Sequence, residues 1–236
     1  LLLAVFLFSL YRVLHILQGY RTAQAVYDKA AQTYMLPVER MDGDAQAEEV
    51  PPQIDFEGLR AVNRDVIGWI FIEGTDVNYP LLAGADNQQY LFQSYMKKYA
   101  VAGSIFLDYR CSTNLSDYHT VIYGHNMKNG SMFKDIVKYK DEEYFMEHQD
   151  ITVYTPEREY HLRPMSVLYT EPTGMRRKTK FATEESFQAY VEEMTKGCSF
   201  AQIPEKPLEQ LWSFITCSYE FNDARTILYA YEVTEE

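Results

Sequence analysis

Residues 211–233 read LWSFITCSYEFNDARTILYAYEV, two apolar runs separated by a short polar loop. Both runs are rich in β-branched and aromatic residues, which favour strands, and the loop carries Ser, Asn and Asp, which favour turns. The segment therefore predicts two neighbouring strands, with Cys217 at the end of the first and Arg225 at the start of the second.

Strand candidates of the same kind occur upstream, and with the C-terminal pair they make eight. They are GWIFI at 68–72, VNYPLL at 77–82, GSIFLD at 103–108, TVIYG at 120–124, ITVYT at 151–155 and EYHLRPMSVLYT at 159–170. Helical patterns are expected after Asp55 and at about 86–93, 131–147 and 184–196. Because strand–helix–strand repeats are few, the pattern favours a mainly β, eight-stranded barrel with N-terminal helices and inserted helices over a doubly wound sheet.

The N-terminal residues 1–17 are apolar and contain no initiator Met, so we interpret them as a truncated transmembrane anchor, although a spanning helix needs about 20 apolar residues. We expect a helical stalk and an acidic linker at 18–53, and a catalytic domain at 54–236. A cleaved signal peptide is the alternative, because Ala23-Gln24-Ala25 resembles a cleavage site. Both interpretations place the domain outside the cytoplasm.

Charge and cysteine content narrow the possible functions. The net charge of -12 argues against nucleic-acid binding, which requires a surplus of Lys and Arg. The three cysteines include no CxxC pair, and their odd number leaves at least one thiol unpaired within the chain. A free cysteine is often only a small buried hydrophobe, so the count alone leaves both catalysis and packing open.

Three reactive side chains stand at predicted strand ends. Cys217 closes one strand, His125 follows TVIYG, and Arg225 opens the last strand. A nucleophile at a strand end can reach a substrate while its strand holds it rigidly, and a barrel can bring such ends together. Singly, each residue has a plainer explanation, since four other histidines compete and an Arg at a strand start is usually a solvated charge.

The order and spacing of GSIFLDYR, TVIYGHNMKNGSMF and FITCSYEFNDAR resemble those of the sortase family, and most closely its class B branch. The family pattern Thr-Leu-x-Thr-Cys followed by Arg appears here as SFITC at 213–217 with Arg225 eight residues after the Cys, so the first two positions depart conservatively. The resemblance covers about residues 54–234, and the long insertion at about 170–210 is the feature typical of class B.

The resemblance implies a membrane-anchored cysteine transpeptidase with Cys217, His125 and Arg225 as catalytic residues. Such an enzyme cuts a C-terminal sorting signal of the NPxTx or xPxTG type after its Thr, holds the product as a thioester, and passes it to an amine of a cell wall precursor such as lipid II. The implied partners are surface proteins carrying that signal, the wall precursor, and the membrane of a Gram-positive cell, with the catalytic domain outside. Neither a metal nor another cofactor is implied.

The same resemblance suggests further substrate contacts. The expected residues are Thr216, Asn87, Leu91 and Tyr123. Core packing is an equally good explanation for Leu91 and Tyr123. In the insertion, the basic residues of TEPTGMRRKTKF (170–181) differ from the family's loop contacts and leave the preferred signal open: Arg176, Arg177, Lys178 and Lys180. They suit anionic wall precursor or lipid head groups, or simply a solvated loop.

Three other functions remain open at this stage. A membrane-anchored extracellular cysteine hydrolase would use the same Cys and His but release the thioester to water. A pilin-polymerising sortase would use a protein amine as acceptor. A non-catalytic surface adhesin would not need the Cys217 thiol.

Overall fold

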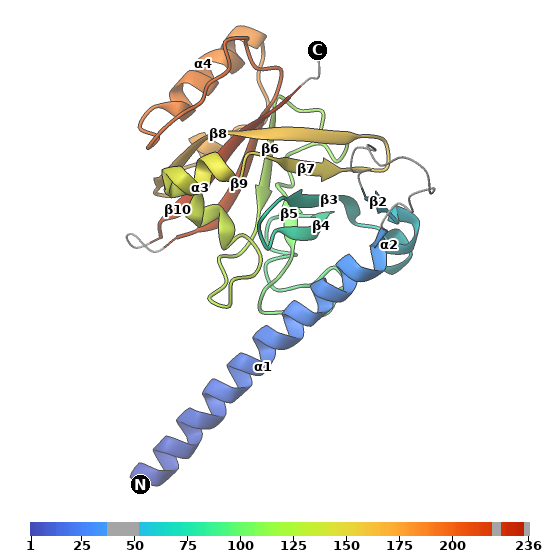
Figure 1. Ribbon diagram of the computed structural model, residues 1–236, viewed down its shortest axis with the longest axis vertical. Coiled ribbons are helices and arrows are strands. Elements are labelled where there is room, and N and C mark those ends of the chain that lie inside the picture. Colours follow the sequence, from blue (N-terminus) through green and yellow to red (C-terminus); the bar gives the residue numbers. More distant parts are fainter. Residues whose placement is uncertain (37–51, 219–222, 234–236) are drawn as a thin grey trace, which may run out of the picture.

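A closed eight-stranded barrel forms the body of the molecule in the computed structural model, which describes residues 1–36, 52–218 and 223–233 (Figure 1). The acidic linker therefore lies almost wholly outside the described residues. The barrel strands are β3 (Val66–Ile72), β4 (Asn78–Ala83), β5 (Ile105–Leu107), β6 (His119–Tyr123), β7 (Ile151–Tyr154), β8 (Glu159–Thr170), β9 (Leu211–Cys217) and β10 (Arg225–Glu232). All eight expected strands are present, so that prediction is confirmed. They form because their apolar, β-branched and aromatic residues favour strands and fill the interior of the barrel.

The strand order around the barrel is β10-β8-β7-β3-β4-β5-β6-β9, with β9 closing on β10. Two neighbouring pairs are parallel, β4 with β5 and β6 with β9, and the other six pairs are antiparallel. Because β6 and β9 are parallel and β10 runs antiparallel to β9, the ends of β6 and β9 and the start of β10 meet at one edge of the barrel. This edge carries the site described below.

Helices lie outside the barrel, and most occur where the sequence predicts them. They are α1 (Leu2–Tyr34), α2 (Phe56–Val62), the 3-10 helix η1 (Asp135–Lys140), α3 (Glu142–Glu147), the 3-10 helix η2 (Met175–Arg177) and α4 (Glu184–Thr195). A two-stranded sheet of β1 (Met35–Leu36) and β2 (Gln53–Ile54) follows α1. Helix α4, in the insertion between β8 and β9, confirms the helix expected at 184–196 and buries Phe187, Tyr190, Val191 and Met194.

The prediction of a helix at 86–93 is wrong, because this segment forms turns. The Asp86 carboxylate accepts hydrogen bonds from the backbone N–H groups of Gln88 and Gln89, at 2.8 and 2.9 Å. Such a side chain competes with helical hydrogen bonding and stabilises a turn instead.

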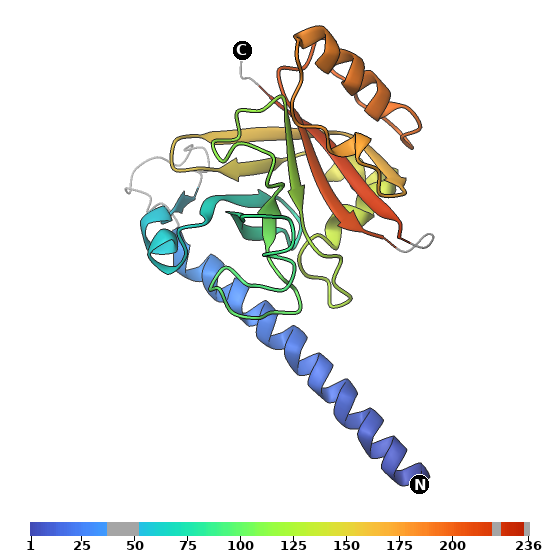
Figure 2. The same ribbon diagram turned by 180° about the vertical axis from the view of Figure 1, so that it is seen from behind.

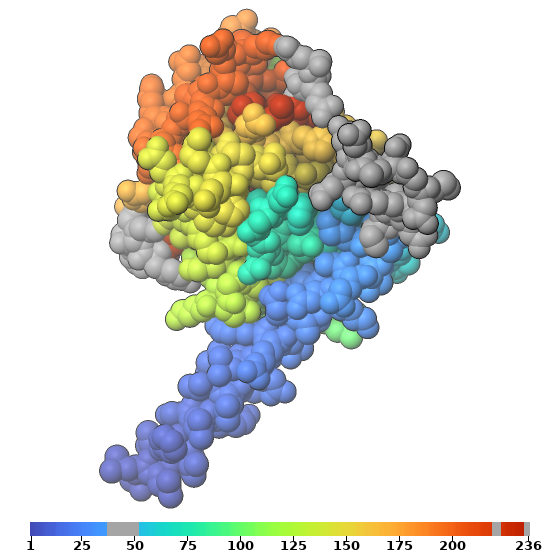
Figure 3. Space-filling model, in the orientation of Figure 1, coloured from blue at the N-terminus to red at the C-terminus, as the bar shows by residue number. Residues whose placement is uncertain are grey.

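Helix α1 has two parts with different environments. Its first half is exposed and apolar, whereas Ala23, Tyr27 and Ala30 in the second half are buried against the barrel. Figure 3 shows the first half standing clear of the globular part. An apolar window with a mean hydropathy of 1.6 makes α1 long and apolar enough to cross a membrane. The second half of α1, which the sequence analysis assigned to a stalk, therefore packs onto the barrel domain.

His119, at the start of β6, joins the insertion to the barrel. Its Nδ1 lies 2.8 Å from the carbonyl oxygen of Lys178, and its Nε2 lies 2.7 Å from the Ser213 hydroxyl. A carbonyl can only accept, so Nδ1 carries the hydrogen and Nε2 accepts from Ser213. Complete burial lowers the pKa of His119 to about 4, which keeps the ring neutral.

This lowered pKa predicts a pH-dependent stability. The unfolded chain binds a proton on His119 below about pH 6.5 and the folded chain does not until about pH 4, so the stabilisation is present above pH 6.5 and is lost as pH falls through that window, by about 3 kcal/mol in total. Urea unfolding between pH 7 and 4 measures the slope. His119→Gln is expected to reduce it, whereas His161→Gln, at an exposed histidine, is expected to leave it unchanged. Equal slopes in wild type and His119→Gln would contradict this origin.

Candidate active site

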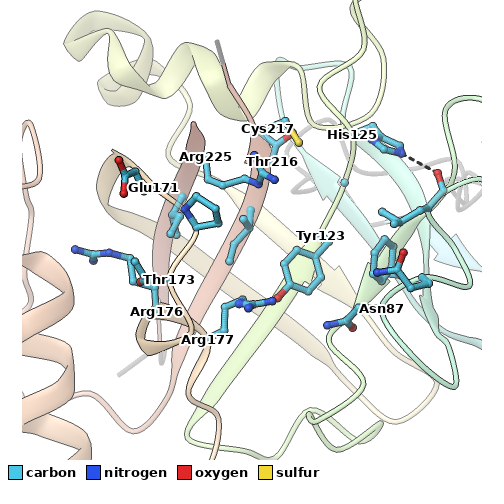
Figure 4. A pocket seen from close by; sticks show the side chains of 17 residues that line it. Asn87, Tyr123, His125, Glu171, Thr173, Arg176, Arg177, Thr216, Cys217 and Arg225 are labelled. Atoms are coloured by element: carbon cyan, nitrogen blue, oxygen red, sulfur yellow. Dashed lines mark hydrogen bonds between the residues drawn. The ribbon is translucent and has the colours of Figure 1, made fainter. Parts of the chain in front are cut away.

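A pocket of about 270 Å³ opens at the barrel edge where β6 and β9 end and β10 begins. All seven residues that the sequence analysis selected for catalysis or substrate contact line it: Asn87, Leu91, Tyr123, His125, Thr216, Cys217 and Arg225. Figure 4 shows Cys217, Thr216 and Arg225 from the C-terminal strand pair facing a space that His125 and Tyr123 border from the side of β6. The structure thus brings together residues spread over more than half of the chain.

Strand register places the three predicted catalytic residues. Arg225 is directly opposite Cys217 in the antiparallel β9–β10 pair. In the parallel β6–β9 pair Tyr123 is opposite Ile215, and the Gly124 N–H extends the ladder by donating to the Ile215 carbonyl at 3.2 Å. His125, two residues beyond Tyr123, therefore emerges level with Cys217, two residues beyond Ile215.

The His125 ring is held from one side. Its Nε2 lies 2.7 Å from the carbonyl oxygen of Leu91, and the Phe92 ring centroid lies 5.6 Å from the imidazole centroid. Because a carbonyl only accepts, Nε2 carries a hydrogen and Nδ1 is the atom left to gain and release a proton. The ring can then change its charge without losing its fixed orientation.

The backbone around Cys217 is also fixed. Asn126 Nδ2 donates to the Cys217 carbonyl at 2.8 Å, and the Ser218 N–H donates to the Ala224 carbonyl at 2.8 Å. Arg225 Nη1 donates to the carbonyls of Asp223 and Ala224, at 2.9 and 3.0 Å. These bonds use one guanidinium nitrogen, and among the residues that the structure describes no partner is seen for the other N–H groups of the fork, which could bind a ligand.

Thr216 is 2% exposed, and its hydroxyl has no hydrogen-bond partner among the residues that the structure describes. A buried hydroxyl without a partner is unfavourable, so an acceptor or donor brought by a ligand would be stabilised there. This supports a contact between Thr216 and substrate.

Asp108, fully buried behind the pocket, organises two of the predicted substrate contacts. It accepts hydrogen bonds from Asn87 Nδ2 at 3.1 Å and from the Tyr123 hydroxyl at 2.8 Å. Arg110 binds the same carboxylate through two nitrogens, at 2.8 and 2.7 Å. Burial alone would raise the pKa of Asp108, but the Arg110 pair and the other hydrogen bonds outweigh it and lower the pKa to about 2.

The insertion contributes residues that sequence reasoning missed or placed differently. Glu171, Pro172 and Thr173 line the pocket directly after β8 and were not selected. Arg176 and Arg177 line it too: Arg176 Nη1 lies 3.3 Å from the Tyr229 hydroxyl, and Arg177 lies beside the Tyr123 hydroxyl (Figure 4). Their position just after the long strand at 159–170 was the available signal, and that strand, β8, pairs with β10, which carries Arg225.

The other two basic residues of the insertion point elsewhere. The Lys178 ammonium lies 4.6 Å from the Phe181 ring centroid, and Lys180 pairs with Asp117. The four cations therefore do not form one common surface. Two of them make the pocket locally basic in an acidic protein, which favours negative charge developing on a bound carbonyl oxygen.

The other cysteines lie outside this pocket. Burial raises the pKa of the Cys111 thiol to about 12 and also raises the pKa of Cys198. Both therefore stay protonated at neutral pH, and protonated thiols are poor nucleophiles. In the described part of the chain no group of three or more His, Cys, Asp or Glu residues is arranged to hold a metal ion.

A family comparison agrees with this arrangement. The sortase domain family matches residues 70–233, which is most of the chain and includes every strand of the pocket edge. This chain belongs to the sortase family. Membership makes it a cysteine transpeptidase, and the observed barrel with its helices confirms the expected fold.

Similar proteins place this sortase with the class B branch. Sortase B of Listeria monocytogenes is 29% identical over 219 residues, covering 92% of this chain and 87% of that relative. Sortase B of Clostridium perfringens has a TM-score of 0.71 and 31% identity, over 75% of this chain and 99% of that structure. A Bacillus anthracis sortase B in complex with AAEK1 has a TM-score of 0.78 and 27% identity, over 93% and 100%.

The Asp108 network predicts a second pH effect in this sortase. Its pKa of about 2 lies below the usual value, so its stabilisation is fully present above about pH 5 and is lost as pH falls from about 4 to 2. Asp108→Asn is expected to lower the free energy of unfolding at pH 7 by about 2 kcal/mol, with a smaller difference from wild type at pH 3. Denaturant unfolding measures both values, with Glu192→Gln on exposed α4 as control. A difference from wild type that stays constant between the two pH values would argue against this role.

Proposed function

We propose that this sortase cuts a C-terminal sorting signal after its Thr through a Cys217 thioester and transfers the acyl group to an amine of a cell wall precursor. The observation that carries the proposal is the convergence of Cys217, His125 and Arg225 on one pocket at the barrel edge. Three residues from separate parts of the barrel edge, one a nucleophile, one a general acid and base and one permanently charged, meet the needs of acyl transfer.

In the first half-reaction the Cys217 thiolate attacks the Thr carbonyl carbon and forms a tetrahedral oxyanion. His125, protonated on both ring nitrogens, gives its Nδ1 proton to the departing amine as the peptide bond breaks, and the thioester remains. The Nε2–H bond to the Leu91 carbonyl keeps the ring in place during this transfer.

In the second half-reaction the acceptor amine attacks the thioester carbonyl. Neutral His125 takes a proton from that amine, and the Cys217 thiolate leaves, so the thiolate and the imidazolium are both restored. A thioester is reactive enough for an amine to resolve, and the cycle consumes no cofactor.

Arg225 and Thr216 contribute to the same carbonyl. The Arg225 guanidinium supplies charge and hydrogen bonds to the oxyanion or to the substrate backbone, and the Thr216 hydroxyl, which has no partner among the described residues, helps to orient it. Asn87, Leu91 and Tyr123 contact the signal residues before the Thr. Asp108 fixes the polar ends of Asn87 and Tyr123.

The cellular setting follows from α1. The apolar helix anchors the protein in the membrane by a single pass, with the catalytic domain on the outer face, where sorting-signal proteins and lipid II are present. In this proposal the anchor lies in residues 1–17, the stalk and linker in 18–53, and the catalytic domain in 54–236.

The acceptor test separates transfer from hydrolysis. Purified protein is incubated with NPxTx and xPxTG peptides, with and without an amine acceptor, and the products are identified by mass. An amide product that requires both acceptor and Cys217 is expected, with Cys217→Ala inactive and Cys111→Ala, at a buried thiol outside the pocket, active.

Other products would overturn this proposal. Hydrolysis with every acceptor would indicate a protease, and transfer only to a protein lysine would indicate pilus polymerisation. Function that survives Cys217→Ala would indicate an adhesin.

The guanidinium fork of Arg225 gives a separate prediction. Arg225→Gln is expected to lower kcat about 100-fold or more, as for loss of an oxyanion donor, while Arg225→Lys retains part of the activity because the charge remains. Peptide cleavage kinetics measure both variants, and thermal unfolding serves as a folding control. Equally small decreases of kcat in the two variants would show that Arg225 takes no part in the chemical steps.

A further inference from the structure

Residues 92–101, between the pocket residue Leu91 and β5, form a compact hairpin, called here the 92–101 hairpin. Gln93 and Tyr99 pair as an antiparallel bridge, and the Ser94 N–H donates to the Lys98 carbonyl at 2.8 Å. Lys97 takes a positive φ of 58° at the turn. These bonds hold the tip, Met96 to Lys98, in a defined shape.

The hairpin exposes large apolar side chains next to lysines. Phe92, Met96, Tyr99 and Val101 are 53%, 39%, 78% and 38% exposed. Lys97 and Lys98 are exposed at the tip, in a protein whose net charge is -12, and the Lys97 ammonium lies 3.2 Å from the Asp65 carboxylate. Grouped exposed apolar residues on a soluble surface mark an interaction site, and Lys98 gives this one a charge opposite to that of the whole protein.

The hairpin lies against α1 where the apolar run of that helix ends. A cavity between them is lined by Ile16, Gly19 and Tyr20 of α1 and by Met96, Tyr99 and Val101 of the hairpin. Ile16 and Leu17, 45% and 47% exposed, are the last large exposed apolar residues of α1. Figures 1 and 2 both show the green segment before β5 beside α1 at this level.

Specific contacts fix the hairpin to α1. The Tyr27 ring centroid lies 5.9 Å from that of Tyr95, and the Tyr27 hydroxyl bonds the Gly103 carbonyl and, at 3.0 Å, the Ser104 hydroxyl. Ser104 in turn donates to the Gln93 carbonyl at 2.7 Å. These contacts join the hairpin directly to the helix.

We propose that the 92–101 hairpin is a second membrane contact, with its tip seated in the headgroup region of an anionic lipid bilayer beside α1. The inference rests on α1 crossing the membrane, as in the proposed function. Tyr suits the boundary between headgroups and acyl chains, exposed apolar side chains are stabilised below it, and a lysine such as Lys98 is attracted to an anionic lipid surface.

The contact has a consequence for the active site. The residue before the hairpin, Leu91, offers the carbonyl bound by His125 Nε2, and Phe92 packs beside the same ring. Seating the hairpin therefore fixes the His125 side of the pocket close to the membrane surface, where an amine carried by a lipid is concentrated.

Tryptophan fluorescence tests the contact without depending on activity. Trp69 and Trp212 are both 0% exposed, so a lipid quencher does not reach them. The full chain carrying Tyr99→Trp is placed in vesicles of phosphatidylcholine and phosphatidylglycerol that contain a lipid with a shallow nitroxide. The emission of the introduced Trp is expected to fall to roughly half, and less when phosphatidylglycerol is omitted.

Two further variants complete the test. Ala189→Trp, at an exposed position on α4, is expected to be unaffected by the quencher, because α4 and the start of α1 lie on opposite sides of the barrel (Figure 1). Leu10→Trp in α1 reports the anchor with a deep nitroxide. Quenching of Leu10→Trp without quenching of Tyr99→Trp would overturn the hairpin contact and leave the anchor standing. No quenching of either would overturn both, and peptide cleavage by the same samples shows independently whether the catalytic proposal holds.

Discussion

The parallel pairing of β6 with β9 is the constraint on which the site depends. Parallel strands end at the same edge, so the residues that follow Tyr123 and Ile215 emerge side by side even though they are 92 positions apart in the chain. The antiparallel return through β10 then places Arg225 opposite Cys217. A slip of one residue in either ladder would turn one of these side chains to the other face of the sheet.

Around this edge, the structure separates reacting groups from supporting groups. The residues that face the pocket are held by partners in the backbone or in the buried layer behind them, such as the Leu91 carbonyl for His125 and Asp108 for Tyr123. A rigid support of this kind reduces the reorganisation needed during acyl transfer. The insertion after β8 closes the remaining side and brings two arginines to a pocket that the barrel alone would leave open.

The strands and α4 were predictable because their signals are local: apolar, β-branched and aromatic runs in the strands and an amphipathic run in α4. The grouping of Cys217, His125 and Arg225 was predictable only with the help of the family resemblance, because local sequence patterns do not indicate which strands pair. The turns at 86–93 were missed because the helical pattern does not record the local bonds from the N–H groups of Gln88 and Gln89 to the Asp86 carboxylate. The bond from Asn87 to Asp108, 21 residues away, is also absent from any local pattern. The inward direction of Arg176 was also hidden, because its partner Tyr229 comes from the last strand.

The contact between Tyr27 and the barrel also bears on how a soluble form of this enzyme is best made. Cutting the chain at the domain start expected from the sequence, near residue 54, would remove the aromatic partner of Tyr79 and Tyr95 and uncover the Ser104 hydroxyl. Cutting near residue 18 removes the exposed apolar run and keeps these contacts. In this protein the end of the membrane segment and the beginning of the folded core fall within the same helix, so the core begins well before the barrel does.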